Sequence, residues 1–414
     1  MIRRVVVNNT KVINNFGYLS VLQIFNLLLP LVTYPYLIRV LGSNLYGTVL
    51  FSQAIIAYFS LIINFGFNIS GTKKIANNVN NKIKLSEIVS SIYLIKFFLF
   101  LLSFFLLLLS ICFITSIKDI WLLILFSFTA TLNELLFPQW YFQGVDKMKY
   151  ITLISLSGRV LFTIFVFIIV KDKGDYLYVP LISGVGLVTT GCISLYILIV
   201  KEKISFFKPT ISKLIYYFKD SVPLFISAAS VQLYVNSNRV LVGSFLGMSE
   251  VAFYDLAEKV LRLIKIPVGM LGQAAFPTLS REKNSRKINQ VMIVGVFMTF
   301  ILMILVYVFS ENIVIILGSK SMLYAVDIMR ILSLSAILVA FSQFLGTNRL
   351  IVFGFKKIFT QIIVSSGIFF AFGFLVLFLF DFISVYTLAW LAVFVELWVS
   401  LCMLIVVYRK KILV

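Results

Sequence analysis

The sequence predicts an all-α polytopic membrane protein, and three observations support this fold class. Hydrophobic residues make up 61% of the 414 residues and charged residues only 13%, whereas soluble domains average about 45–50% and about 25%. The apolar residues fall in runs of about 20 residues, which is the length of a helix that crosses a bilayer. Lys and Arg gather in every second connection between these runs. Together these features indicate about twelve transmembrane helices.

Twelve apolar stretches meet the length criterion. In chain order they are 15–38, 46–70, 88–113, 119–142, 150–170, 176–200, 221–246, 250–277, 288–310, 322–345, 358–380 and 384–408. The connections between them are short, the longest being about twenty residues. No separate domain outside the membrane is therefore expected.

The distribution of basic residues tests this count, because cytoplasmic loops of membrane proteins carry an excess of Lys and Arg. The loops and ends expected on one side carry 24 Lys and Arg residues, among them Arg349, and the opposite side carries five. Those five are Arg39, Lys118, Lys171, Lys173 and Lys320. Both termini are therefore expected in the cytoplasm. The net charge of +20 then reflects membrane topology, and no nucleic-acid partner is expected.

The chain also repeats itself at about half its length. Residues 41–47, which follow the first span, are echoed by residues 246–252 after the seventh, an offset of 205. Gln143-Gly144 is echoed by Phe353-Gly354 at an offset of 210. Such repeats are typical of transporters, and they predict two six-helix lobes, residues 1–205 and 206–414. Chance similarity between glycine-containing loops is the alternative explanation.

Several classes of chemistry are disfavoured by the residues that the sequence lacks. It contains no histidine and only three isolated cysteines, so neither a metal site nor a histidine-dependent catalytic triad is expected. It also lacks the glycine-rich motif that binds ATP phosphates. With short outside loops as well, the sequence predicts no enzyme activity and no cofactor.

The span 250–277 carries an unusual stripe of charges. Asp255, Glu258, Lys259, Arg262 and Lys265 recur at spacings of three and four residues, which places them on about a third of the helix circumference. A charge facing the bilayer centre costs at least about 2.5 kcal/mol, so the stripe is expected to face the protein interior. Asp255 can pair with Lys259, and Glu258 with Arg262, which leaves Lys265 without an acid one turn away. The stripe either binds an anion through its surplus cation or only holds the helix by internal ion pairs.

Other polar residues lie inside expected spans. Asn236 and Arg239 on 221–246 and Asn26 on 15–38 occupy corresponding places in the two halves. Lys96 and Arg159 either face the interior of the helix bundle or extend to the cytoplasmic surface.

Carboxylates are the side chains best suited to carry protons in a chain without histidine. Glu134 and Glu396 lie near the middle of their spans with no cation one turn away. A cation on another helix is an equally good explanation for each. The candidates for ion coupling are Glu134, Asp255, Glu258 and Glu396.

Several segments resemble the Wzx-type O-antigen flippases. Residues 137–149 contain WYFQG followed by KMK, residues 34–76 resemble the first two helices of that family, and 276–281 resemble the end of its eighth. The resemblance spans the chain in order. It implies membership of the multidrug/oligosaccharidyl-lipid/polysaccharide (MOP) exporter superfamily, with two six-helix lobes around a central cavity that opens alternately to either side. Arg39 and Gly42 in these motifs look structural, so no binding role is carried over to them.

The resemblance further implies a function in a bacterial cytoplasmic membrane. The cargo would be an undecaprenyl-pyrophosphate-linked oligosaccharide that moves from the cytoplasmic to the periplasmic leaflet. The polysaccharide polymerase and chain-length machinery are candidate partners, beside membrane lipids. Since the family cavity is typically cationic, the candidate binding residues are Arg239, Lys259, Arg262, Lys265, Arg159, Lys96, Asn236 and Asn26. The competing hypothesis is a cation-coupled multidrug or metabolite antiporter of the same superfamily, which should prefer a net acidic cavity.

Overall fold

The computed structural model describes residues 2–412, and this part of the chain contains helices but no strand. The elements of the first half are α1 (Ile2–Asn64), α2 (Phe67–Ala76), α3 (Lys82–Phe113), α4 (Thr115–Lys118), α5 (Trp121–Phe128), η1 (Thr129–Thr131), α6 (Leu132–Leu136), α7 (Gln139–Gly144), α8 (Met148–Ile169), η2 (Lys173–Leu177), α9 (Tyr178–Tyr196) and η3 (Ile197–Lys201). Those of the second half are α10 (Ile211–Phe245), α11 (Met248–Glu282), α12 (Ser285–Val308), α13 (Ser310–Leu317), η4 (Lys320–Met322), α14 (Ala325–Leu345), η5 (Gly346–Ile351), α15 (Lys356–Leu379) and α16 (Val385–Arg409).

The expected number of membrane spans agrees with these helices. Within residues 2–412, nine helical stretches are long and apolar enough to cross a bilayer. The first of them, Ser20–Ala76, covers two spans, because α1 kinks at Gly42, where φ is 79° and ψ is 169°. Polar and charged side chains interrupt α10 and α11, but each has 35 residues, which is long enough to cross. The fold class predicted from the sequence, all-α with about twelve spans, is confirmed.

The chain divides into two compact units by its contacts. Unit 1 contains the chain up to Leu41 together with Ser52–Ala228, and unit 2 contains Gly42–Phe51 together with the chain from Ala229 onward. These units reflect packing, whereas the lobes 1–205 and 206–414 were predicted from internal repetition. The division into two repeat lobes stays a prediction.

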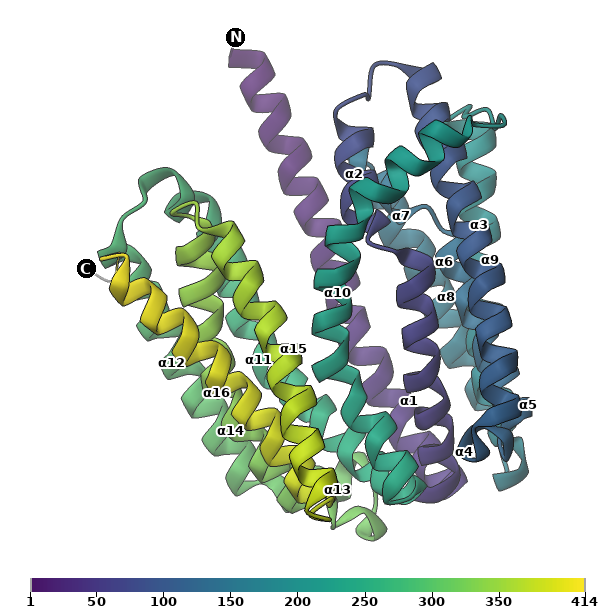
Figure 1. Ribbon diagram of the computed structural model, residues 1–414, viewed down its shortest axis with the longest axis vertical. Helices are drawn as coiled ribbons and strands as arrows, with labels where there is room; N and C mark the ends of the chain where they lie inside the picture. The colour runs from purple at the N-terminus through teal and green to yellow at the C-terminus, as the bar shows by residue number, and fades with distance from the viewer. Residues whose placement is uncertain (1, 413–414) are drawn as a thin grey trace. The chain divides into compact units, whose positions relative to one another are not determined.

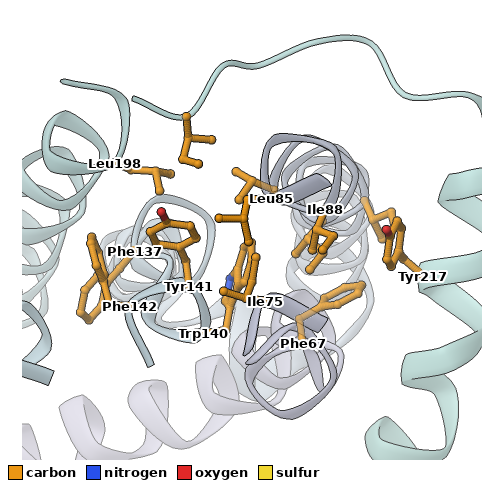
Figure 2. Close-up of a cluster of buried hydrophobic side chains, with 14 of the residues drawn as sticks. Phe67, Ile75, Leu85, Ile88, Phe137, Trp140, Tyr141, Phe142, Leu198 and Tyr217 are labelled. Carbon is orange, nitrogen blue, oxygen red and sulfur yellow. The ribbon is translucent and has the colours of Figure 1, made fainter. Parts of the chain in front are cut away.

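Unit 1 is built around a buried aromatic cluster. Trp140, Tyr141 and Phe142 of α7 are at most 2% exposed, and they lie beside residues of α2 and α3 (Figure 2). A Cβ atom at Gly144 would lie 2.7 Å from Cβ of Ile75, so the absence of a side chain lets α7 approach α2 closely. The WYFQG segment is therefore a packing element.

Unit 2 packs its helices around α14, which contacts α11, α12, α13 and α16 (Figure 1).

Two glycines of unit 2 explain one of the sequence repeats. Gly42 and Gly247 both have positive φ, 79° and 128°, with ψ of 169° and 166°, a conformation that is essentially confined to glycine. A Cβ at Gly47 would lie only 1.7 Å from the carbonyl oxygen of Met248, so these two repeated segments are in direct backbone contact.

One basic residue is not where the sequence analysis placed it. Arg349 was counted among the cytoplasmic loop cations, which is wrong, because its side chain is completely buried. The six residues Gly346–Ile351 continue α14 as a π-helical turn, which carries Arg349 back into the helix packing. The excess of basic residues on the predicted cytoplasmic side remains large without it.

Candidate functional site

A polar cavity lies within unit 2, between α10, α11, α14 and α16. Its volume is about 210 Å³. The lining residues are Tyr234, Val235, Asn236, Asn238, Arg239, Tyr254, Glu258, Leu261, Arg262, Lys265, Leu332, Ser335, Ala392 and Glu396. Three of the six cations predicted for the binding site, Arg239, Arg262 and Lys265, therefore reach one cavity.

The charged stripe of α11 is held mainly by a cation from another helix. Arg239 of α10 donates from Nε to Glu258 Oε2 at 2.7 Å and from Nη2 to the same oxygen. The Nε atom of Arg239 also lies 3.3 Å from Asp255 Oδ1. The side chain of Asp255 is 1% exposed and that of Glu258 is 13% exposed. Arg239 is thus the nearest cation to Glu258, and it also helps to neutralise the buried Asp255.

Lys259 completes this network on the side of Asp255. Its ammonium group donates to Asp255 Oδ2, as the spacing of four residues predicts. It also lies over the ring of Tyr46, 5.7 Å from the centroid, which is within the range of a cation–π interaction. Lys259 does not line the cavity, so its role in the structure is to compensate Asp255.

Arg262 shares both of its carboxylate partners with cations that lie closer to them. Its Nη2 atom lies 3.9 Å from Asp255 Oδ1 and 3.8 Å from Glu258 Oε2, and both carboxylates have closer partners. Its side chain is 52% exposed, compared with 14% for Arg239. The i, i+4 pairing of Glu258 with Arg262 is therefore only peripheral, because the interhelical bond to Arg239 is shorter and better shielded.

Lys265, expected to lack an acid on its own helix, faces one on α16. Its Nζ atom lies 3.8 Å from Glu396 Oε1. The four cations of the stripe and α10 thus meet three carboxylates, Asp255, Glu258 and Glu396. One positive charge is in excess, and the geometry assigns it to Arg262, where the sequence analysis had assigned it to Lys265.

Neutral polar groups add hydrogen-bonding capacity to the cavity. Asn238 donates from Nδ2 to Tyr254 Oη at 2.7 Å, and its Oδ1 has no hydrogen-bond partner among residues 2–412. Asn236 lines the cavity as predicted, together with Ser335 and Tyr254. The sequence analysis missed Tyr254, although it lies four residues before Glu258 and so on the same face of α11.

The remaining predicted residues lie in unit 1. Lys96 is 2% exposed and donates to the backbone oxygen of Glu134 at 2.8 Å. The carboxylate of Glu134 accepts a hydrogen bond from Asn64 Nδ2 at 2.9 Å. This carboxylate lies where its transmembrane span is broken into α5, η1, α6 and α7. Lys96 and Glu134 thus form a buried polar group of their own.

Asn26 and Arg159 are not part of that group in the structure. Asn26 has a buried Oδ1 atom without a hydrogen-bond partner in the described chain. Arg159 lies on α8 and is exposed.

Comparison with known proteins gives consistent results. The family model described as "Polysaccharide biosynthesis protein" matches residues 12–283. The chain is 26% identical over 377 residues to the "Putative O-antigen transporter" of Escherichia coli (strain K12). The matched region covers 87% of this chain and 88% of that protein. The chain is 27% identical over 256 residues to the protein of the same description from Shigella dysenteriae, covering 62% and 64%.

Solved structures share the fold. The lipid II flippase MurJ in an inward closed conformation aligns with a TM-score of 0.77 at 15% identity, covering 95% of this chain and 88% of that one. An inward-facing multidrug resistance MATE family transporter of the MOP superfamily aligns with a TM-score of 0.72 at 13% identity, covering 96% and 98%. The all-α fold of MATE and MurJ transporters, which the sequence resemblance implies, is thereby confirmed.

Proposed function

Because this chain belongs to the family of polysaccharide biosynthesis proteins and is a multi-pass membrane protein, we propose that it is a lipid-linked oligosaccharide flippase. In this proposal it moves an undecaprenyl-pyrophosphate-linked O-antigen unit from the cytoplasmic to the periplasmic leaflet by alternating access. The similarity to proteins described as "Putative O-antigen transporter" supports the class of cargo.

The observation that carries the proposal is the cationic cavity of unit 2. Arg239 and Lys259 are fully used in compensating buried carboxylates, and Lys265 faces Glu396. Arg262 is half exposed and lines the cavity, so its guanidinium is available to an anionic ligand. A planar guanidinium binds phosphate oxygens in a bidentate manner.

The physical need for such a site follows from the cargo. A pyrophosphate and several sugars cannot enter hydrocarbon without losing their hydration, which is very costly. Fixed cations replace water around the phosphates, and amide and hydroxyl groups such as those of Asn236, Asn238 and Ser335 can meet sugar hydroxyls. The polyprenyl tail stays in the bilayer.

The size of the cavity sets which part of the cargo it holds. A volume of about 210 Å³ is below the range of about 300–1,000 Å³ typical of pockets that enclose a whole small ligand. We therefore assign this cavity to the pyrophosphate and the sugar joined directly to it, and not to the whole oligosaccharide.

The setting of the protein follows from the same proposal. It lies in a bacterial cytoplasmic membrane with both termini in the cytoplasm, and it performs no covalent chemistry. Polysaccharide polymerase and chain-length machinery are candidate partners on the periplasmic side. The alternative, a cation-coupled antiporter for drugs or metabolites, fits the charge of the cavity less well, because a cationic cargo would have to approach an excess positive charge.

The test is to delete the gene in its host and determine on which leaflet the lipid-linked oligosaccharide accumulates. Sealed vesicles of both orientations are treated with a membrane-impermeant reagent that oxidises sugars. Flippase function predicts single units on the cytoplasmic face. Accumulation on the periplasmic face, or no accumulation, would mean that translocation does not depend on this protein.

A further inference from the structure

Arg349 is a buried guanidinium outside the cavity described above. It lies in the π-helical turn η5 and is completely buried. Its Nη2 atom donates to Asn289 Oδ1 and lies 3.5 Å from the backbone oxygen of Ser285. Its Nε and Nη1 atoms have no hydrogen-bond partner within residues 2–412.

These unsatisfied donors indicate a missing anion. A guanidinium carries five N–H donors and always remains charged, and a buried charge without a counter-charge is strongly unfavourable. Among the ion pairs between described residues, none includes Arg349. The protein itself thus provides this cation with hydrogen-bond acceptors but no carboxylate.

Arg349 lines a long apolar groove between α12, α14 and α16. The groove has a volume of about 480 Å³, and Arg349 is the one charged residue among its lining residues. Leu397, Leu401 and Leu404 follow the groove along two turns of α16, a length of about 10 Å at 1.5 Å per residue. They are 36%, 46% and 44% exposed, so the groove is open at the surface. It shares no lining residue with the cationic cavity.

We propose that this groove binds one anionic phospholipid of the surrounding membrane, with the phosphate at Arg349 and an acyl chain along α16. A phosphate supplies the acceptors that Nε and Nη1 lack, and a chain of methylenes matches the leucines of the groove. The positive-inside pattern places this end of α14 at the cytoplasmic side, where basic pockets between transmembrane helices bind anionic head groups. This site does not depend on the function proposed above.

The test uses the purified, delipidated full-length protein in detergent and measures lipid binding by native mass spectrometry. Phosphatidylglycerol, phosphatidylcholine and undecaprenyl phosphate are titrated in parallel. We expect wild-type protein to bind phosphatidylglycerol about tenfold more tightly than phosphatidylcholine, and at least as tightly as undecaprenyl phosphate. Arg349→Met should abolish this preference.

Two further variants separate binding from folding. Arg286→Gln removes an exposed charge from the same end of α12 and should bind lipid like the wild type. Leu401→Trp keeps Arg349 but fills the groove, and it should lose the tight phosphatidylglycerol site even if Arg349→Met fails to fold. The proposal is overturned if Leu401→Trp keeps that site, if a folded Arg349→Met keeps the preference, if wild-type protein does not discriminate between the two phospholipids, or if undecaprenyl phosphate binds much more tightly than phosphatidylglycerol.

Discussion

The two arginines of the cationic cavity should respond differently to replacement by glutamine: Arg239→Gln should reduce stability, whereas Arg262→Gln should reduce transport. Arg239 is 14% exposed and holds Glu258 at 2.7 Å. Removing one partner of a buried ion pair costs about 3–5 kcal/mol. At about 2–4 °C per kcal/mol, Arg239→Gln should lower the melting temperature by at least roughly 6 °C.

Arg262→Gln should leave the fold nearly unchanged, because its contacts are 3.8 and 3.9 Å long and its side chain is 52% exposed. Exposed pairs of this kind contribute about 0–1 kcal/mol. A hydrogen bond from a charged group to the cargo contributes about 1.5–3 kcal/mol, so its loss should reduce transport about 10- to 100-fold.

The assay measures melting in detergent and surface polysaccharide after complementation of a deletion strain, with equal protein levels. Arg281→Gln, an exposed arginine near the end of the same helix, is the matched control and should behave like the wild type in both measurements. Normal polysaccharide with Arg262→Gln, or wild-type melting with Arg239→Gln, would refute this assignment of roles.

Three further predictions follow from other contacts. Lys265→Met and Glu396→Gln should each reduce stability, as measured by melting. The double variant should lose about 1 kcal/mol less stability than the sum of the two single losses. A double loss equal to that sum would mean that the 3.8 Å pair contributes nothing to stability. Gly47→Val should prevent accumulation of folded protein, because its Cβ would lie 1.7 Å from the carbonyl oxygen of Met248. The control is Gly174→Ala, whose Cβ would have no atom within 4 Å and which should give the wild-type profile in fluorescence-detected size-exclusion chromatography. A monodisperse Gly47→Val in the same measurement would contradict the close contact. Glu134→Gln should impair transport driven by an imposed pH gradient in vesicles, and unchanged transport there would exclude this carboxylate from coupling.

The fold could be predicted from sequence because it depends on properties that are local along the chain. Length of apolar runs and the side on which Lys and Arg gather are enough to place twelve spans. The charged side chains of α11 were likewise expected to face inward. In the structure, four of the five, all except Arg262, have side chains that are at most 28% exposed. Spacing along one helix also identified the pair of Asp255 and Lys259 correctly.

Partners on other helices could not be predicted in this way. The spacing rule pairs Glu258 with Arg262, but Arg239 of α10 competes for the same carboxylate and binds it more closely. Lys265 finds Glu396 across a sequence distance that no local pattern reveals. Arg349 was misplaced for a related reason, since its segment reads as a polar connection and is buried only because it continues α14 as a π-helical turn.

The proposed function requires the passage of an anionic lipid-linked oligosaccharide through the cationic cavity. Its most direct test is reconstitution of the purified protein into liposomes that contain lipid-linked oligosaccharide extracted from the deletion strain. An impermeant sugar-oxidising reagent then reports exchange between leaflets over time. We expect complete labelling with wild-type protein and a rate of labelling about 10- to 100-fold lower with Arg262→Gln. Labelling that stops at the outer leaflet, as in protein-free liposomes, would contradict the proposed function.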